Sequence, residues 1–452
     1  MITEETVSGY WYVPGKDHIH FNGQLTFGPE HSPRLLLTAT KTHDLSSFPF
    51  DTVDYTIWGY SISGDPITLF GCNRLTVRSG GGGVQTADFN TGSIAFGAHI
   101  SSADEASIDS VRFSFAGMED WMGVFEQEIE FASDDINAYQ LSVQRPKDIP
   151  FKINEEITGA WTFWTSRPYI KSRDIRLQQD NLFRLEFRPA VSLSCVLKEV
   201  WSFQLLYTLF TFEKTWVKWI YLGHNDKELR LFYRQRGVLS EEPERIFPLI
   251  QFVHVASKFE AAISAWTRLR PGLKQVMGIL NANIGISDQY VHNDFLNIVQ
   301  AVEAYHRRVL QDTDALKDSN GPRVTRILAA VNDPEDKQWL QNRLAFSHEP
   351  NLAARLKELL GVHSPALFEE PPSKKQMNKL IRNVVDKRNY YTHYDVSLEN
   401  NEDETVKLIG LTKFMTLLLA YCLLAEIGFD SEFLQGKVYR RYRFRLSKGE
   451  KD

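Results

Sequence analysis

The spacing of apolar residues changes once along this chain, near residue 245. Before that point, runs that alternate apolar and polar residues, such as 55–61 and 110–116, are separated by clusters of turn-forming residues. Such alternation is typical of antiparallel strands. After that point, apolar residues recur three and four positions apart, which indicates amphipathic helices. We therefore predict an α+β protein, with an N-terminal antiparallel β-sandwich-like region over residues 1–245, in one lobe or two, and a C-terminal all-α region over residues 246–452.

The helical half contains several candidate helices and two candidate breaks. A polar segment at 239–245 separates it from the β region, and the dipeptides 321–322 and 371–372, which contain proline, are expected to interrupt helices. The expected helices, with one inside the β region at 197–209, are 252–268, 272–284, 289–311, 322–331, 336–344, 351–361, 374–393, 404–428 and 430–436.

The composition limits where this protein acts and what it binds. A net charge of −6 over 452 residues gives no global sign of nucleic-acid binding, so any RNA site has to be a local basic patch. The most apolar segment, 408–429, carries Lys413 and Glu426, so we expect a buried core helix and no membrane partner. The three cysteines are too few and too scattered for a disulfide framework or a zinc site. Together with an N-terminus that lacks a secretory signal, this favours a cytoplasmic location.

Residues 388–393 bring together the groups needed to cut RNA without a metal. Arg388 can hold a phosphate through two parallel hydrogen bonds, and His393 can take or give a proton near neutral pH. Asn389 can fix which imidazole nitrogen faces the substrate. On an ideal helix Arg388 and His393 lie about 140° apart around the axis, so they converge only if the arginine wraps round or the helix ends or distorts there. The alternative interpretation is a charged helix end with no catalytic role.

The surrounding residues occur in an order that is known from one family. The segment 294–308 carries Phe295, a glutamine-alanine pair and Glu303 before a tyrosine-histidine-arginine sequence. Segments 343–356 and 380–394 follow, and the second contains the arginine–histidine motif. In this order and spacing the helical half resembles the ApeA-like branch of the HEPN domains.

The N-terminal half is similar to the opening of the ApeA N-terminal domain. The similarity rests on Gly9-Tyr10-Trp11, Pro14-Gly15 and Gly23-Gln24-Leu25, with Trp121 and Trp266 as further matching positions. The resemblance thus covers nearly the whole chain.

The resemblance implies a metal-independent endoribonuclease of the anti-phage, abortive-infection type that needs no cofactor. HEPN nucleases usually act as dimers, so a homodimer or a higher homo-oligomer is expected. Arg388 and His393 would be catalytic, Asn389 takes the polar position after the arginine, and Glu303 takes the acidic position of the earlier helix. RNA is the expected substrate, with transfer RNA as a candidate target. A phage-derived trigger, detected by the β region, is a further expected partner.

Basic residues near the motif and at the C-terminus are candidates for RNA binding. The last stretch, 437–448, holds six basic residues interleaved with Tyr439, Tyr442 and Phe444, a composition that can follow an RNA backbone while its rings stack on bases. The alternative is a solvated terminal tail. The candidate RNA-binding residues are Lys387, Arg307, Arg308, Arg440, Arg441 and Arg443.

Other functions have weaker support in the sequence. Glu303 and His306 form a glutamate-x-x-histidine motif, but a di-iron bundle needs a second copy, so no metal site is expected. The glycine run 80–83 lacks the ending of a phosphate-binding loop and indicates a hairpin loop. Two alternatives stay open: a non-catalytic HEPN module that binds a nucleotide or RNA or only dimerises, and carbohydrate recognition by the tryptophan-rich β half.

Overall fold

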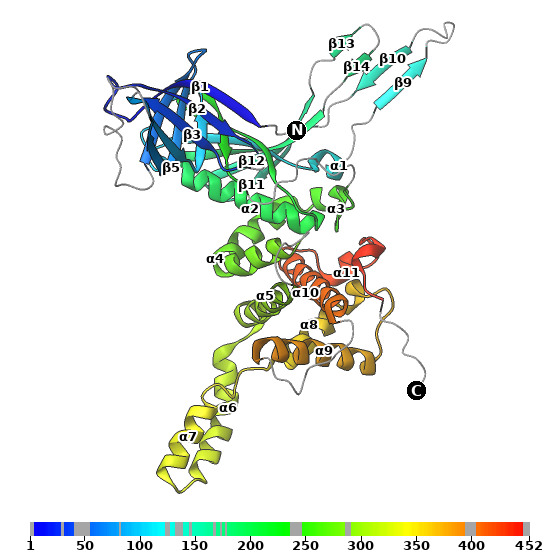
Figure 1. The fold of residues 1–452 in the computed structure, drawn as a ribbon. Coiled ribbons are helices and arrows are strands. Elements are labelled where there is room, and N and C mark those ends of the chain that lie inside the picture. Colours follow the sequence, from blue (N-terminus) through cyan, green and yellow to red (C-terminus); the bar gives the residue numbers. More distant parts are fainter. Residues whose placement is uncertain are drawn as a thin grey trace. The chain divides into compact units, whose positions relative to one another are not determined.

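In the computed structural model, strands and helices separate along the chain, as Figure 1 shows. The structure describes residues 4–28, 31–39, 55–80, 83–122, 127–131, 139–143, 147–165, 169–171, 174–176, 179–235, 246–284, 291–393 and 404–445. Two compact units are present: the β unit comprises residues 1–211 and 215–260, and the helical unit comprises residues 212–214 and 261–452. The α+β class is confirmed, whereas the expected linker at 239–245 lies outside the described residues.

Most strands of the β unit belong to one antiparallel sheet. Its order is β11-β12-β15-β8-β16-β17-β7-β5-β4-β1-β2-β3-β6, and β5 also pairs with β6. The strands of this sheet are β1 (Glu5–Tyr12), β2 (Phe21–Phe27), β3 (Arg34–Ala39), β4 (Tyr55–Ser61), β5 (Pro66–Ser79), β6 (Gln85–Asn90), β7 (Ser93–Phe96), β8 (Ile108–Phe115), β11 (Ile149–Lys152), β12 (Ile157–Thr165), β15 (Gln179–Val191), β16 (Val217–His224) and β17 (Lys227–Tyr233). Two separate hairpins are β9 (Gln127–Phe131) with β10 (Tyr139–Val143), and β13 (Tyr169–Lys171) with β14 (Asp174–Arg176).

One end of this sheet closes into a barrel instead of forming the expected sandwich. The first half of β5 pairs with β4 and the second half with β6, so the strands β5-β4-β1-β2-β3-β6 form a ring. Buried side chains such as Trp11, Leu35 and Phe89 fill its interior. Gly59 lets the Trp11 indole lie directly on the β4 backbone, because a Cβ at that position would clash with the ring. The glycine run joins β5 to β6, which confirms the expected hairpin.

The other half of the sheet is covered by one helix. Helix α2 (Leu193–Thr211) packs on β8, and its Phe203 ring lies edge-on to Phe113 at 5.6 Å and to Phe183 at 4.9 Å. Such edge-to-face contacts add to the burial of apolar area. The short helices α1 (Met118–Met122) and α3 (Phe252–Ala256) complete this unit. The indole of Trp121 in α1 stacks on Phe210 of α2 and meets the ring of Phe252 in α3 edge-on.

The helical unit is built around α10 (Glu404–Glu426), which packs against α5 and α8. Its segment 414–424 is almost fully buried, as expected for a core helix. The stretch Thr405–Glu426 is long and apolar enough to cross a bilayer, but 67% of it is buried inside the structure. The other helices are α4 (Phe259–Asn283), α5 (Val291–Tyr305), a π-helix (His306–Leu310), α6 (Thr313–Ala329), α7 (Pro334–Leu344), α8 (Leu352–Leu367), α9 (Lys374–His393), α11 (Ser431–Leu434) and a 3₁₀ turn (Arg440–Tyr442).

One of the two expected helix breaks is wrong. Pro371-Pro372 does separate α8 from α9, and α9 has the predicted bounds. Pro322, however, lies inside α6. A proline in a helix removes one hydrogen bond and crowds the preceding turn, and α6 continues through this local loss with an Asp312 side-chain cap at its start.

The buried imidazole of His363 in α8 is expected to make the helical unit sensitive to acid. His363 is 4% exposed, and burial lowers its pKa from 6.5 to about 4. As the pH falls below 6.5, the unfolded chain takes up a proton at His363 that the folded chain does not. The contribution of the neutral imidazole to the free energy of unfolding is therefore complete above pH 6.5 and is lost as the pH falls toward 4. The loss between pH 7 and pH 5 is about 2 kcal/mol.

This acid sensitivity can be measured by urea unfolding, followed by helical circular dichroism at both pH values. A His363→Leu variant serves as the control, because it lacks the titrating group and should lose less stability on acidification. An equal loss in the parent and the variant would contradict this role of His363.

Candidate functional site

The inner face of α9 carries Arg388. Ile381, Val384 and Arg388 lie on one side of the helix, and the two apolar residues are buried there. The guanidinium Nη2 lies 3.8 Å from an Oε2 of Glu303 on α5, which packs against α9. Both side chains are partly exposed, at 34% and 25%. The structure thus brings Arg388 and Glu303 together, and Nη1 of Arg388 also donates to Oδ1 of Asn389 at 3.1 Å.

His393 lies on a different face of the same helix. Because α9 is helical through His393, the five-residue step from Arg388 places the two side chains about 140° apart. His393 is exposed, whereas Arg388 faces α5. The helix neither ends before nor distorts at the motif, so a single chain does not bring these two groups together.

The exposed face of α9 is basic, a feature that sequence reasoning missed. Lys375, Lys379 and Arg382 are exposed and project within about 40° of the direction of His393. The helix as a whole carries six basic residues and one acidic residue, Asp386. Lys375, Lys379 and Arg382 follow one another at intervals of four and three positions. This helical periodicity is the sequence signal that places them on one face. This face can attract the phosphates of a polyanion and guide them toward the imidazole.

Several of the predicted RNA-binding cations already have partners. An Nη2 of Arg307 lies 2.6 Å from Glu349, and Arg441 lies 2.7 Å from Glu213. Arg440 forms two hydrogen bonds with Glu369, at 2.7 and 3.3 Å. Arg308 donates to the carbonyl of Gly272 at 2.7 Å, and the Lys387 ammonium lies 5.8 Å from the centre of the Tyr390 ring.

The basic C-terminal stretch packs on the helical unit. Tyr442 is 2% exposed, so its ring is not available to stack on a base. The ring of Phe444 lies 5.2 Å from Phe414 of α10. Arg443 has its Nε and one Nη hidden from solvent without a hydrogen-bond partner in the described part of the chain. Among the described residues of this stretch, Tyr439, Arg440, Arg441 and Arg445 are exposed.

A buried polar network lies next to the Glu303–Arg388 pair. Arg355 of α8 is 2% exposed and bonds Nδ1 of His306 at 2.9 Å, the side chain of Gln311 at 2.8 Å and the carbonyl of Pro350 at 3.0 Å. His306, also 2% exposed, is bonded through its Nε2 to Glu358 at 2.8 Å. Burial, followed by the neighbouring charge of Arg307, lowers the pKa of Arg355.

This network fixes the end of the helix that carries Glu303. His306 begins a five-residue π-helix that directly follows α5, and Glu303 lies one turn earlier. π-Helical turns inside helices are frequent at functional sites. His306 lies in the interior, next to the segment that carries Glu303. Sequence reasoning also missed Arg355, whose partners come from two separate segments, 306–311 and 349–350.

The described residues contain no group of three or more acidic, histidine or cysteine side chains placed to hold a metal. The imidazole of His306 is engaged by Arg355 and Glu358. Glu303 and His306 therefore act in separate local networks.

The two units differ in charge. Residues 261–452 contain 27 lysines and arginines against 24 acidic residues, whereas residues 1–260 contain 24 against 33. The excess of basic residues thus lies in the helical part, although the whole chain is acidic. A polyanion such as RNA is favoured there on electrostatic grounds.

Two family models match the chain. ApeA N-terminal domain 1 matches residues 6–266, which is more than half of the chain, and Apea-like HEPN matches residues 296–433. No curated protein and no solved structure matches it significantly. HEPN domains are typically ribonucleases, which supports a nuclease or defence role in general. The resemblance seen in the sequence is therefore confirmed, and the chain belongs to the ApeA family, with an ApeA N-terminal domain followed by an ApeA-like HEPN domain.

Proposed function

We propose that the protein is a metal-independent endoribonuclease that cuts RNA, with transfer RNA as the first target to test, in abortive infection. It acts in the cytoplasm as a homodimer. The observation that carries the proposal is the Glu303–Arg388 pair beside a basic helix that ends in His393, within the HEPN match. The same residues supply a proton-transfer group and a fixed cation, which RNA cleavage needs.

The reaction uses a nucleophile that RNA itself carries. An imidazole of His393 removes the proton of the ribose 2′-hydroxyl, and the 2′-oxygen attacks the adjacent phosphorus. The bond from phosphorus to the 5′-oxygen breaks, and the same imidazole, now protonated, gives its proton to that leaving oxygen. The products are a 2′,3′-cyclic phosphate and a 5′-hydroxyl. Each proton transfer contributes about 10²- to 10⁴-fold.

Arg388 stabilises the negative charge that develops on the non-bridging phosphate oxygens. Glu303 and Asn389 hold its guanidinium in place through the 3.8 Å ion pair and the 3.1 Å hydrogen bond. A preorganised charge of this kind is worth about 3 kcal/mol of transition-state stabilisation. The ion pair with Glu303 is partly exposed, so a phosphate can compete for the guanidinium at little cost.

The divergence of Arg388 and His393 supports a site made from two chains. A twofold axis near α9 would place the imidazole of one protomer opposite the guanidinium of the other. The exposed cations Lys375, Lys379 and Arg382 would then guide RNA along the same face toward the cleft.

Cleavage is expected to continue when divalent metals are removed. Purified total RNA and transfer RNA should be cut equally well with and without EDTA, because protein side chains perform both proton transfers. Single-stranded DNA of the same sequence should stay intact, since it lacks the 2′-hydroxyl. Sequencing the ends of the fragments tests for cyclic phosphates, and Mg²⁺-dependent cutting or 3′-hydroxyl ends would contradict the mechanism.

A second candidate function is a non-catalytic HEPN module. Its supporting observation is that Arg388 is held by Glu303 while His393 faces another direction. Such a module would retain RNA in a gel-shift assay without producing new ends. In either function the β unit is proposed to sense a phage-derived trigger that controls the helical unit.

A further inference from the structure

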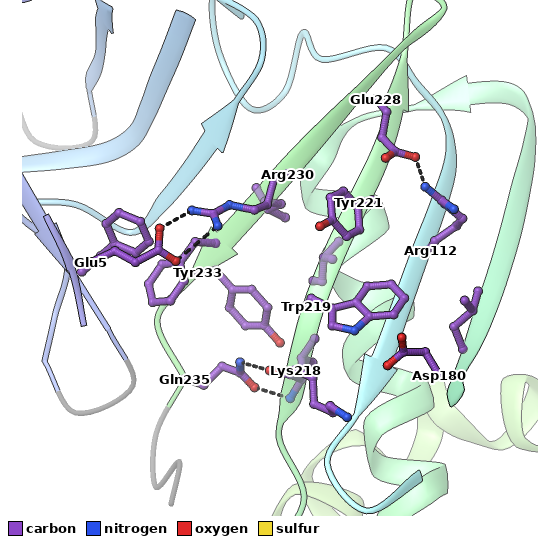
Figure 2. Close-up of a pocket in the computed structure, with 16 residues that line it drawn as sticks. Glu5, Arg112, Asp180, Lys218, Trp219, Tyr221, Glu228, Arg230, Tyr233 and Gln235 are labelled. Atoms are coloured by element: carbon purple, nitrogen blue, oxygen red, sulfur yellow. Dashed lines mark hydrogen bonds and ion pairs between the residues drawn. The ribbon is translucent and has the colours of Figure 1, made fainter. Parts of the chain in front are cut away.

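The β unit contains an open cavity of about 600 Å³ outside the barrel. It lies on β16 and β17, the strands that continue the sheet beyond β8, and β1 and β2 contribute to its rim. Figure 2 shows its residues. Its volume lies within the range of about 300 to 1,000 Å³ that is typical of small-molecule sites.

Aromatic side chains form part of the cavity lining. Trp219 and Tyr221 are neighbours on one face of β16, with ring centres 5.5 Å apart, and both are partly exposed. The rings of Phe27, which is 2% exposed, and Phe232 lie 5.0 Å apart and also line the cavity. Half-exposed rings such as those of Trp219 and Tyr221 can stack on a flat ligand ring without any change in the fold.

Two arginines flank these rings. Arg112, Tyr221 and Arg230 are opposite one another on β8, β16 and β17, so the two cations lie on either side of the tyrosine. Figure 2 shows the same arrangement. The Arg112 guanidinium lies 5.7 Å from the centre of the Tyr221 ring.

Both guanidiniums are held by carboxylates that a stronger anion can replace. Arg230 bonds both oxygens of Glu5, at 2.7 and 3.2 Å, and Arg112 pairs with Glu228. All four side chains are about half exposed, so these pairs are weak. A phosphate carries more charge than a carboxylate and accepts the planar fork of arginine in two bonds.

The inner end of the cavity can recognise a base edge. Asp180 is 8% exposed and lines the cavity together with Trp219; both are labelled in Figure 2. A carboxylate at this depth accepts hydrogen bonds from an amine on a heterocycle. The amide of Gln235 exchanges two hydrogen bonds with the backbone of Val217, at 2.7 and 2.9 Å, and so fixes the strand end that closes the cavity.

We infer that this cavity binds a single nucleotide whose base carries an exocyclic amine. The base stacks on Trp219, its amine bonds Asp180, and its phosphate takes Arg112 and Arg230 from their carboxylates. A long nucleic acid is disfavoured, because residues 1–260 carry 33 acidic side chains against 24 basic ones. A neutral sugar is disfavoured, because it cannot replace Glu5 and Glu228 on the two guanidiniums.

Calorimetric titration of the full chain tests this inference without any reference to RNA cleavage. AMP, GMP and CMP should bind with dissociation constants below about 100 μM, and UMP should bind more weakly because it lacks the amine. The double variant Arg112→Gln with Arg230→Gln should weaken AMP at least about tenfold. Trp219→Leu should also weaken AMP by about tenfold, the loss of one stacking contact. Arg188→Gln is the matched control, because its side chain is 82% exposed on β15 and lies outside the cavity.

Photolabelling keeps the inference testable if a cavity variant fails to fold. An azido derivative of AMP, irradiated with the parent protein, should modify the segment 217–235 and be displaced by unlabelled AMP. The inference is overturned if no nucleotide binds below about 1 mM, or if the label attaches elsewhere. It is also overturned if a panel of simple glycosides binds in place of nucleotides and loses binding in the Trp219→Leu variant.

Discussion

Replacing Arg388 or His393 with alanine is expected to abolish RNA cleavage while the protein stays folded. Loss of the imidazole removes proton transfer, a loss of about 10²- to 10⁴-fold, and loss of the guanidinium removes charge stabilisation, a loss of about 10²- to 10³-fold. Stability should change little, because His393 is exposed and the Arg388–Glu303 pair is partly exposed. Single-turnover cleavage of a labelled RNA, with circular dichroism as the folding control, measures both effects.

Mixing the two inactive variants distinguishes a shared site from a site within one chain. If each site takes Arg388 from one protomer and His393 from its partner, a heterodimer of Arg388→Ala with His393→Ala contains one intact site. Random exchange of equal amounts makes half of the dimers mixed, so about a quarter of the parental activity should return. No recovery after verified subunit exchange would contradict the shared site. Parental activity in either single variant would contradict the catalytic roles.

Replacing Arg355 with alanine is expected to destabilise the helical unit by about 3 to 5 kcal/mol, the range for breaking a buried charged pair. The substitution leaves Nδ1 of His306, the Gln311 side chain and the Pro350 carbonyl without their donor. It also removes the positive charge that faces Glu349. Urea unfolding followed by the helical circular dichroism signal measures the change, because it reports mainly on this unit.

A surface arginine of the same unit is the matched control for Arg355. Arg343 of α7 is exposed and lies over the Trp339 ring at 5.6 Å, so Arg343→Ala should change stability by less than about 1 kcal/mol. Arg355→Lys keeps the charge but not the planar fork, and should give an intermediate loss. If Arg355→Ala unfolds at the same urea concentration as Arg343→Ala, the network does not have the structural importance assigned to it.

The spacing of apolar residues predicted the individual strands and helices, but it did not predict that one end of the sheet closes into a barrel. The bounds of α9 and the positions of most strands followed from apolar spacing and from turn residues. The barrel depends on β5 pairing with different strands along its length, with a register shift between Arg74 and Thr76. Alternation assigns each residue of a strand to a face, but it carries no information on which distant strand lies alongside.

The residues of the proposed nuclease site were partly accessible from the sequence. The neighbouring motifs placed Glu303 and Arg388 on two helices that the structure brings to 3.8 Å. The interior position of Arg355 was not accessible, since arginine is rarely buried and no local pattern marks its partners. The β-unit cavity was also missed. Its residues Arg112, Trp219 and Arg230 lie on three different strands and come together only when these strands pair.

The closed end of the large sheet restricts how copies of this protein can aggregate or assemble. Because β5 and β6 pair with each other, β11 is the end strand that keeps a free edge in the described part of this sheet. That strand has only four residues, among them Pro150, which has no N–H to donate, and Lys152, whose charge deters stacking. Joining through the backbone ladder of this sheet is therefore discouraged, and a complex formed on the sheet depends on side-chain surfaces, where substitutions can adjust its strength without disturbing the strands beneath.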